Sequence, residues 1–447
     1  MSKMVKLSDL ITEISMGPFG SDIKVECFVN EGIPVLNGAN LTGYKLVENG
    51  FRYVTKEKAQ SFRKAIAKRG DIVITHRGTL GQISYIPDDS KFDEYVISQS
   101  QFRVALNEEL VDPIYFVYYF HTSEGQRRLL ANKCHVGVPA LAQATTNFKL
   151  IEIPLPKFDV QRKIASILSS LDAKIELNNK INAELEAMAK TLYDYWFVQF
   201  DFPNVEGKPY KTSGGKMVYN EELKREIPVG WEVGTFGTYA KSKGGFAFKS
   251  EWWQDEGIPV IKIKDIQENY TLDLNRISYV DVSKLDIAKA YEAKAGDVVI
   301  AMTGATVGKY AIVPLHSKPI LVNQRVALFD LGNEPINSLP FLINSLNQEY
   351  FRETVFTLAS GAAQPNISNS QIDNIPLVVP NKELITDYNS KLISTYKTIL
   401  NNQVENQHLS SLRDWLLPML MNGQVTVGAA REVLGMVAED GVGYETK

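Results

Sequence analysis

The sequence is poor in the residues from which disulfide frameworks and metal sites are built. Its 447 residues include 2 cysteines, Cys27 and Cys134, which are far apart and form no CxxC pair. The 5 histidines never fall into an HxH or HExxH pattern. We therefore expect no disulfide framework, no zinc site and no metal catalysis, and we interpret the histidines as surface or hydrogen-bonded core residues.

Long apolar runs are also missing. The N-terminal stretch MSKMVKLSDLITEIS has polar residues where a secretory signal would be apolar. No run of about eighteen apolar residues follows it, so we expect a cytoplasmic protein without a membrane segment. The length predicts two or three domains, and 44% hydrophobic with 22% charged residues is typical of a folded globular chain.

Acidic and basic residues nearly balance, with a formal net charge of -4. A nucleic-acid-binding face is usually basic, because lysine and arginine replace the counterions condensed on phosphates. The overall charge does not indicate such a face, but the charge is unevenly distributed. Residues 52–69 contain 7 lysines and arginines against one glutamate, which predicts a local basic patch.

The sequence contains an internal repeat. EGIPVLNGANL at 31–41 returns as EGIPVIKIKDI at 256–266, and GDIVITHRGTLGQ from Gly70 returns as GDVVIAMTGATVGK from Gly296. Further along, IEIPLP returns as DNIPLVVP, and LNN at 177–179 returns at 400–402. The offsets lie between 222 and 226 residues and the order is kept. Such a repeat predicts two copies of one structural plan.

The first part of each repeat, about 155 residues, predicts a mixed α+β domain. DIVIT and DVVIA are β-branched runs bounded by glycine, which is typical of strands. VDPIYFVYYFHTSEGQRRLL predicts a helix, because Asp112 suits the N-cap and Pro113 the first turn. NSLPFLINSL occupies the matching place in the second repeat.

The second part of each repeat predicts a long amphipathic helix. From Ile164 to Tyr195 apolar residues recur at steps near three and four, and a looser version of this pattern runs from Asp387 to Leu417. A helix of ~35 residues is roughly 50 Å long. The residues predicted to pair the helices are Ile164, Leu171, Asn178, Leu185 and Leu192 in the first, and Leu392, Ile399 and Leu412 in the second.

Asparagines occur at the same place in both stripes. Asn178 and Asn179 in the first helix correspond to Asn401 and Asn402 in the second. One interpretation is that they set the register of the paired helices, since a polar residue in a coiled-coil seam restricts how the helices align. The other is that they lie on a solvated helix face.

Two segments predict little regular structure. DFPNVEGKPYKTSGGKMVYNEELKREIPVGWEV, between the first helix and the second globular part, is rich in glycine, proline and lysine and predicts a connector. After Asn422 we assign no fold to the tail.

TGATVGKY at 303–310 is one residue short of the phosphate-binding motif G-x-x-x-x-G-K-[ST]. A phosphate-binding loop ends in a helix N-terminus, but YAIVP after Lys309 predicts a strand. The first repeat has Gln82 where Lys309 stands. We therefore predict strand, glycine turn and strand in each repeat, with glycines that permit positive φ. Direct contact of the turn with a ligand is the alternative.

The sequence lacks the familiar signatures of catalysis. The sequence contains no [DN]PP[YF] segment of the kind expected in an adenine methyltransferase, no G-x-S-x-G and no HExxH. The chain is predicted to bind a partner or ligand without chemistry of its own.

Together these features resemble the specificity subunit of a Type I restriction-modification system. The resemblance rests on GIPV, GD(I/V)VI…G and the IPLP-like phrase of each repeat, and on the helical segments PLPKFDVQRKIASILSSLDAKIELNNKINAELEAMAKTLYDYWF and LRDWLLPMLMNGQV. The loops GVPAL at 137–141 and GAAQPNIS at 361–368 are also similar to those of the family. The resemblance covers the chain from Leu7 to Val425.

The resemblance implies a DNA-recognition protein without enzymatic activity. Each repeat would contain a target-recognition domain that reads one half of a bipartite, asymmetric double-stranded DNA site. The long helices would pack as an antiparallel coiled coil, and the duplicated chain would have an internal pseudo-two-fold axis. Two methyltransferase subunits and the restriction subunits would assemble on the chain. S-adenosylmethionine, ATP and Mg would be bound by these partners and not by this chain.

On this basis the chain divides into six segments. They are 1–156 (first target-recognition domain), 157–200 (first spacer helix), 201–230 (connector), 231–380 (second target-recognition domain), 381–422 (second spacer helix) and 423–447 (tail).

DNA-contacting residues have to be chosen by their chemistry, because recognition domains vary within the family. Arginine and lysine suit phosphate and guanine, and threonine is a further polar contact. The candidates are Arg63, Lys64, Arg69, Arg77 and Thr79 in the first domain, and Lys262, Lys264, Thr303, Thr306 and Lys309 in the second. The alternative for each, which the residue type alone favours, is an ordinary solvated side chain. The alternative functions are a coiled-coil adaptor that binds no DNA and an ATP-binding protein that uses residues 303–310.

Overall fold

The computed structural model describes residues 3–18, 22–134, 138–267, 269–274, 276–360 and 364–440. The chain forms two compact units, Met1–Lys174 with Leu409–Lys447, and Ile175–His408. Each unit holds the globular part of one repeat together with a portion of both long helices. The six predicted segments divide the chain more finely than these units and stay a prediction.

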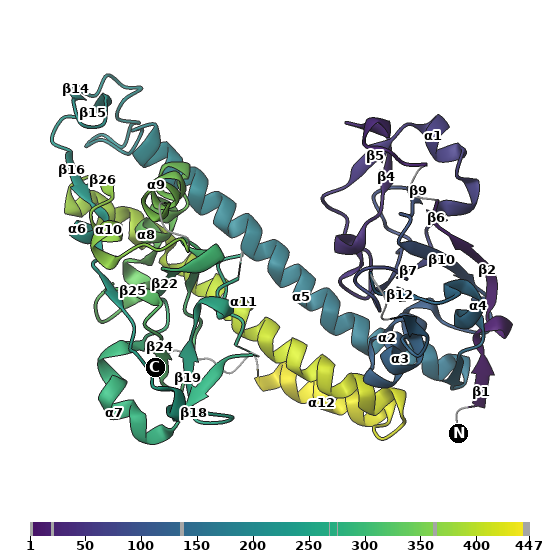
Figure 1. Ribbon diagram of the computed structural model, residues 1–447. Coiled ribbons are helices and arrows are strands. Elements are labelled where there is room, and N and C mark those ends of the chain that lie inside the picture. The colour runs from purple at the N-terminus through teal and green to yellow at the C-terminus, as the bar shows by residue number, and fades with distance from the viewer. Residues whose placement is uncertain are drawn as a thin grey trace. The chain divides into compact units, whose positions relative to one another are not determined.

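The first repeat is built on two main sheets (Figure 1). The antiparallel four-stranded sheet β2-β10-β7-β8 consists of β2 (Ile11–Met16), β10 (Gln101–Leu106), β7 (Ile72–Thr75) and β8 (Ile83–Tyr85). The five-stranded sheet β3-β5-β4-β9-β6 consists of β3 (Phe28–Val29), β5 (Arg52–Val54), β4 (Ile33–Val35), β9 (Glu94–Val96) and β6 (Ile66–Lys68). Two strand pairs complete it, β1 (Lys3–Lys6) with β13 (Glu152–Leu155), and β11 (Lys133–Cys134) with β12 (Ala140–Leu141).

The second repeat has sheets of the same topology. Its four-stranded sheet β17-β25-β22-β23 consists of β17 (Ser242–Gly244), β25 (Val326–Phe329), β22 (Val298–Ala301) and β23 (Tyr310–Ile312). Its five-stranded sheet β18-β20-β19-β24-β21 consists of β18 (Trp253–Gln254), β20 (Ser278–Val280), β19 (Ile258–Ile261), β24 (Ile320–Val322) and β21 (Glu292–Ala293). β16 (Glu232–Thr235) pairs with β26 (Pro376–Val379) as β1 pairs with β13. The strand orders of the main sheets correspond one to one, so the sequence repeat is a structural duplication.

Short helices pack against these sheets. In the first repeat they are α1 (Lys56–Gln60), α2 (Pro113–His121), α3 (Ser123–Leu129) and α4 (Ala144–Lys149). In the second they are α6 (Phe236–Tyr239), α7 (Leu285–Ala288), α8 (Leu339–Leu346), α9 (Glu349–Ala359) and α10 (Asn369–Asp373).

The predicted helix start at Asp112 is confirmed, because its carboxylate accepts the amide of Tyr115 at 2.8 Å. That helix is shorter than predicted. Thr122 adopts an extended backbone after α2, and its hydroxyl caps α3 by accepting the Gly125 amide at 3.0 Å.

Both long helices predicted from the apolar stripes are present (Figure 1). α5 spans Phe158–Tyr193 and continues as a π-helical turn, Asp194–Val198. α11 spans Lys382–Met421, and the predicted apolar pattern from Asp387 to Leu417 lies within it. The tail, to which we assigned no fold, forms α12 (Val427–Asp440). Among the described residues, no helix is long and apolar enough to cross a membrane.

The helices pair antiparallel, as contacts inside each unit show. In the second unit Asn178 on α5 donates to Glu405 (2.6 Å) and Asn406 (3.0 Å) on α11, and Asn402 donates to Asn182 at 2.8 Å. Residue numbers therefore rise along one helix as they fall along the other. In the first unit the corresponding polar contact joins Arg413 to Asp172 at 2.6 Å.

Most of the residues predicted to pair the helices are buried. Ile164, Leu171, Asn178, Leu392 and Ile399 are at most 7% exposed, while Leu185, Leu192 and Leu412 are half-buried. The asparagines divide between the two interpretations. Asn178 is buried between the helices, whereas the hydrogen bond of Asn179 with Asn406 is solvent-exposed, and the partners of Asn178 are not Asn401 and Asn402.

The connector has more structure than predicted. β14 (Met217–Asn220) and β15 (Arg225–Pro228) form a hairpin within it. Phe202 and Ile227 are buried in the core of the second unit, where the Phe202 ring stacks on Trp231 with centroids 5.1 Å apart. A few isolated aromatic and aliphatic residues anchor this segment without any periodic pattern.

Candidate nucleic-acid interface

A glycine turn connects two antiparallel strands in each repeat, β7 to β8 and β22 to β23. Four glycines in these turns have φ between 77° and 88°, a conformation that a side chain disfavours. They are Gly78 and Gly81 in the first turn, and Gly304 and Gly308 in the second. Lys309 is followed by β23 and not by a helix, so residues 303–310 lack the helix N-terminus on which a phosphate-binding loop depends.

A second loop is bonded to each glycine turn in the same way. In the first repeat the Gly78 amide donates to Pro139 O and the Leu141 amide to His76 O, both at 2.9 Å. In the second repeat the Gly304 amide donates to Pro365 O and the Ile367 amide to Met302 O, both at 2.9 Å. Each residue of the second set is 226 positions after its counterpart in the first (304 − 78, 365 − 139). These loops contain GVPAL and GAAQPNIS, of which Gly137 and residues 361–363 lie outside the described residues.

A third segment, just after β4 or β19, reaches the same turn. In the first repeat the side-chain amide of Gln82 donates to Gly38 O at 2.8 Å, in the short helix Gly38–Leu41. In the second repeat the short helix Ile263–Asp265 leads to Ile266 and Gln267, which line a hollow together with Lys309. Three segments that are distant in sequence therefore meet at each glycine turn and form the candidate interface.

The first-domain candidates differ in how they are held. Arg69 contacts its own domain through an ion pair with Asp93 (3.0 Å) and a hydrogen bond that it donates to Ser90 O (2.7 Å). The side chains of Arg63, Lys64 and Arg77 are exposed and form no ion pair with a described residue. Thr79 is exposed at the tip of the glycine turn. Arg77 and Thr79 share this turn, whereas Arg63 and Lys64 lie in the short helix Arg63–Ala65.

In the second domain, Lys262 lies over the Trp253 ring, 3.3 Å from its centroid, and burial lowers its pKa. Lys264 donates to Arg276 O at 3.0 Å. Thr303, Thr306 and Lys309 are all in the glycine turn. The hydroxyl oxygens of Thr303 and Thr306 are buried and find no hydrogen-bond partner in the part of the chain that the structure describes.

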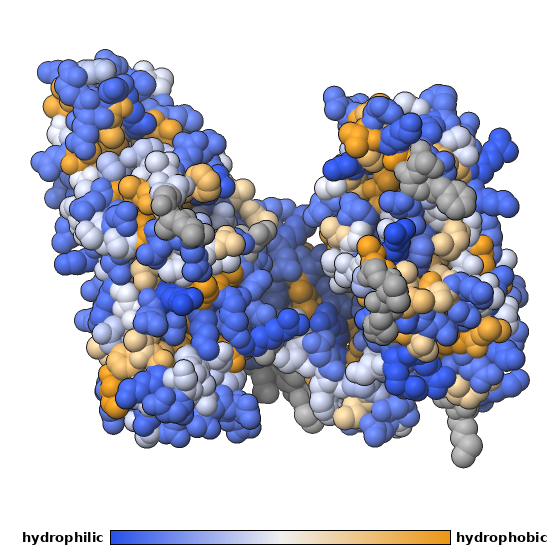
Figure 2. All heavy atoms as spheres, in the orientation of Figure 1, coloured by the Kyte–Doolittle hydropathy of each residue, from blue (hydrophilic) through white to orange (hydrophobic). Residues whose placement is uncertain are grey.

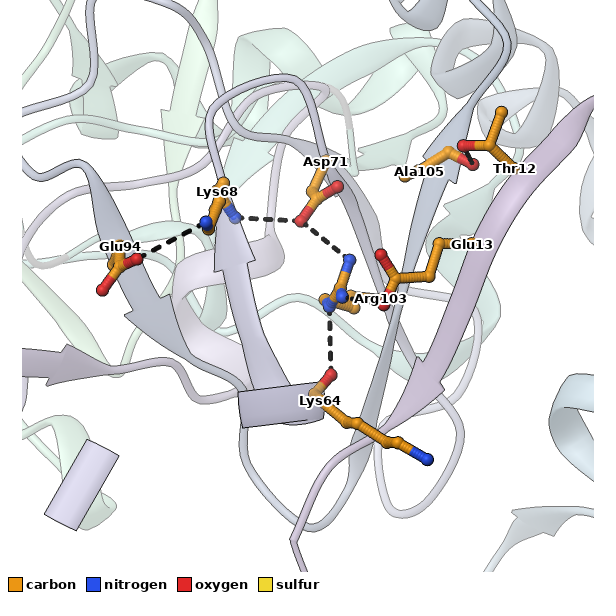
Figure 3. Close-up of polar contacts among 8 residues, drawn as sticks. All are labelled: Thr12, Glu13, Lys64, Lys68, Asp71, Glu94, Arg103 and Ala105. Atoms are coloured by element: carbon orange, nitrogen blue, oxygen red, sulfur yellow. Dashed lines mark hydrogen bonds and ion pairs between the residues drawn. The ribbon is translucent and has the colours of Figure 1, made fainter. Parts of the chain in front are cut away.

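Sequence reasoning missed the buried residue Arg103 on β10, which supports the short helix bearing Lys64 (Figure 3). Its guanidinium pairs with Asp71 at 3.3 Å and with Glu13, and it donates to Lys64 O at 3.1 Å. Figure 3 shows the Lys64 side chain extending away from this cluster. The signal was an arginine within the apolar strand QFRVAL, where an unpaired charge would be costly.

The second repeat holds the equivalent carbonyl with a different cation. Leu328 occupies the place of Arg103 in the strand pairing, opposite Val299 where Arg103 is opposite Val73. Lys243 on the neighbouring strand β17 donates instead to Ala290 O, 226 positions after Lys64, at 2.6 Å. The buried carboxyl of Asp297, the counterpart of Asp71, borders a hollow of about 590 Å³ that Leu328 and Lys243 also line.

These two buried carboxyls have perturbed pKa values. Burial raises the pKa of Asp71, although the Lys68 amide and Arg103 oppose that shift. Burial raises the pKa of Asp297 to about 6, where the Lys294 amide, which donates at 2.7 Å, and the Lys294 charge oppose the shift.

No other chemistry is evident in the described residues. Within them, no group of three or more histidine, cysteine, aspartate or glutamate side chains could hold a metal ion. The faces of both units seen in Figure 2 are mainly hydrophilic, with smaller hydrophobic patches. Such surfaces are suited to binding a polar or charged partner.

Comparison with known families finds two copies of the Type I restriction modification DNA specificity domain, at residues 3–187 and 228–407. The chain is 26% identical over 430 residues to the Type I restriction enzyme MjaIX specificity subunit of Methanocaldococcus jannaschii, covering 94% of this chain and 93% of that protein. It is also 26% identical to the Type I restriction enzyme HindI specificity subunit of Haemophilus influenzae, covering 81% and 88%.

A solved structure shows the same fold. The Type-I restriction-modification system S subunit from M. genitalium matches with a TM-score of 0.53 at 17% identity, covering 94% of this chain and 96% of that one. The family match spans both repeats and therefore most of the sequence. The chain thus belongs to the family of Type I restriction-modification specificity subunits, the DNA target-recognising and non-catalytic components of these systems.

Proposed function

We propose that this subunit reads a bipartite, asymmetric DNA site, with one half read by each repeat. The observation that carries this proposal is the duplicated interface. In each repeat the same two backbone hydrogen bonds, 226 residues apart, join a second loop to the glycine turn, and a third segment lies beside that turn. The side chains on this common frame differ, as with Gln82 and Lys309. The same backbone arrangement with two different sets of side chains suits one chain that reads two different half-sites.

Within this proposal the chain is also an assembly platform. Two methyltransferase subunits bind it, and restriction subunits join them. S-adenosylmethionine, ATP and Mg are bound by these partners. The proposal is supported by the relatives being specificity subunits of restriction enzymes, and by the two repeats, which offer each of two identical partners an equivalent surface.

A DNA reader differs from a coiled-coil adaptor in its response to salt. Because lysines and arginines release counterions from phosphates, the affinity of the complex for DNA should fall steeply between about 50 and 200 mM salt. The experiment is a titration of duplex DNA into this subunit assembled with its methyltransferase subunits, with the methyltransferase alone as the control. Lys64→Gln should reduce the slope of log affinity against log salt by about 1. A flat salt response of the complex would favour the adaptor.

A further inference from the structure

A hollow of about 280 Å³ lies beside the glycine turn of the second repeat, between the turn and α9. It is lined by Gln267, Tyr270, Val307, Gly308, Lys309, Tyr310, Arg352, Val355 and Phe356. A second hollow of about 540 Å³ shares Gln267 and Lys309 with it and adds the polar side chains of Asn269 and Thr271. The two form a continuous concave region at the candidate interface.

In the first repeat a glutamine side chain lies over the corresponding glycine turn. Gln126 on α3 donates to Gly81 O at 2.8 Å and to Phe120 O at 2.7 Å, so its side chain lies over the glycine turn. A Cβ built on Gly81 would be 2.2 Å from the Gln126 Oε1. The residue 226 positions after Gln126 is Arg352, which lines the hollow of the second repeat. At this position of equivalent helices the first domain therefore has a glutamine that lies over the turn, and the second has an arginine that lines a hollow. The second turn is instead approached by Val355, whose Cγ1 lies 2.9 Å from a Cβ built on Gly308.

The lining of this hollow combines cations with aromatic surface. The Arg352 side chain is exposed and forms no ion pair with a described residue, and Lys309 comes from the glycine turn. Phe356, one helical turn after Arg352, is 73% exposed. Exposed aromatic rings beside arginine and lysine suit a ligand that has both a flat ring and a phosphate.

The backbone at this site is also unusual. Tyr270 has φ of 61°, which is disfavoured for a residue with a side chain. Its ring stacks on Tyr310, with ring centroids 5.0 Å apart and an angle of 9° between the ring planes. Tyr310 in turn is hydrogen-bonded to Asn347. Strained conformations of this kind cluster at ligand-binding sites, where the surrounding structure holds them. This observation is independent of the charges.

We propose that this hollow binds one nucleotide unit of the second DNA half-site. Arg352 and Lys309 contact its phosphate, and the Gln267 amide contacts the base edge, for which adenine is the best match because glutamine can pair with N6 and N7. The inference rests on the proposed function and adds an asymmetry to it. Only the second domain has this contact, because Gln126 fills the equivalent place in the first.

The test exchanges the residue that distinguishes the two repeats. Arg352→Gln, placed in the complex with the methyltransferase subunits, should weaken binding of the cognate duplex about tenfold and lower the salt slope by about 1. Lys397→Gln is the matched control, because it removes one exposed positive charge from α11 outside both hollows. Gln267→Ala should relax base preference at one position of the second half-site, at a cost of about 1–3 kcal/mol in discrimination, or roughly 5- to 150-fold. Methylation mapping of the complex reads out that position.

The outcomes separate this inference from the function on which it rests. If the complex binds and methylates a bipartite site, but Arg352→Gln behaves like Lys397→Gln and Gln267→Ala leaves every position unchanged, the nucleotide site is wrong and the proposed function stands. If relaxation appears in the first half-site, the assignment to the second domain is wrong. If the complex shows no salt-dependent DNA binding, the proposed function itself fails.

Discussion

Single residues show that the two repeats stabilise the same backbone fold with different charged side chains. In the first, Asp71 and Glu13 surround the buried guanidinium of Arg103. In the second, Leu328 takes the place of the arginine in the strand pairing, and burial raises the pKa of Asp297 to about 6. The carboxyl of Asp297 is therefore one side chain through which pH should act on the second domain, beside Asp265, whose pKa burial also raises.

The stability of the second domain should decrease as pH rises. The folded-state pKa of about 6 lies above the ordinary value of about 3.9. Folding favours the protonated form of Asp297. The contribution of this form to the free energy of unfolding is therefore complete below about pH 4 and is lost as pH rises through about 6. Asp297→Asn stays neutral and can still accept the Lys294 amide. We expect it to be more stable than the parent by on the order of 2 kcal/mol at pH 8 and equal to it near pH 4 in urea unfolding.

A second substitution tests the cause of this pH dependence. Leu328→Arg places a guanidinium in the hollow beside Asp297, as Arg103 stands beside Asp71. An opposite charge lowers a carboxyl pKa, so the loss of stability between pH 4 and 8 should shrink. Equal pH dependence in the parent, Asp297→Asn and Leu328→Arg would show that another group is responsible.

The sequence predicted the backbone structure of the candidate interface better than the roles of its side chains. The glycine turn was predictable because its twin lacks the lysine of a phosphate-binding loop, and both turns show the expected positive φ. The candidates were chosen by residue type alone. Lys262, which follows β19, is held over Trp253 of β18, a contact that no local pattern indicates. Arg103 and Gln126 could be interpreted only once their partners were visible.

Among the elements, the paired helices depend on polar contacts in an apolar seam. Asn178 is 1% exposed and donates two hydrogen bonds to α11, at Glu405 and Asn406. A leucine there would bury more apolar surface but would not discriminate between alignments of the helices. We infer that Asn178 sets the register at some cost in stability.

Cross-linking measures this register directly. In a Cys27→Ser, Cys134→Ser background, the pair Asn182→Cys and Asn402→Cys should form a disulfide, because these side chains are in contact. The pair Asn182→Cys and Asn406→Cys, one helical turn away, should not. With Asn178→Leu added, we expect both pairs to cross-link. If only the first pair still forms, the register is set by contacts other than Asn178.

Elements with a strong period were the predictable ones. The 36 residues of α5 and the 40 of α11 repeat their apolar residues over many turns, so both helices were found from the sequence. The hairpin β14–β15 and the break at Thr122 were not, because each depends on a few contacts and caps. The burial of Phe202 and Ile227 was not predictable, because the surrounding segment is rich in glycine and lysine and shows no apolar period.

For the whole molecule, the central claim is that duplication gives one chain two DNA-reading domains with independent specificity. The matching strand orders of the main sheets make the domains equivalent as folds. Gln126 against Arg352 distinguishes them beside the glycine turn, and Arg103 against Leu328 distinguishes them in the interior. Independent domains of this kind should be exchangeable one at a time.

The most direct measurement exchanges residues 1–155 for the corresponding segment of another specificity subunit. The chimera is co-expressed with the methyltransferase subunit, and methylated adenines are mapped across a genome beside those of the parent. One half of the methylated site should change, while the other half stays as in the parent. A change in both halves, or in neither, would contradict the assignment of one half-site to each repeat.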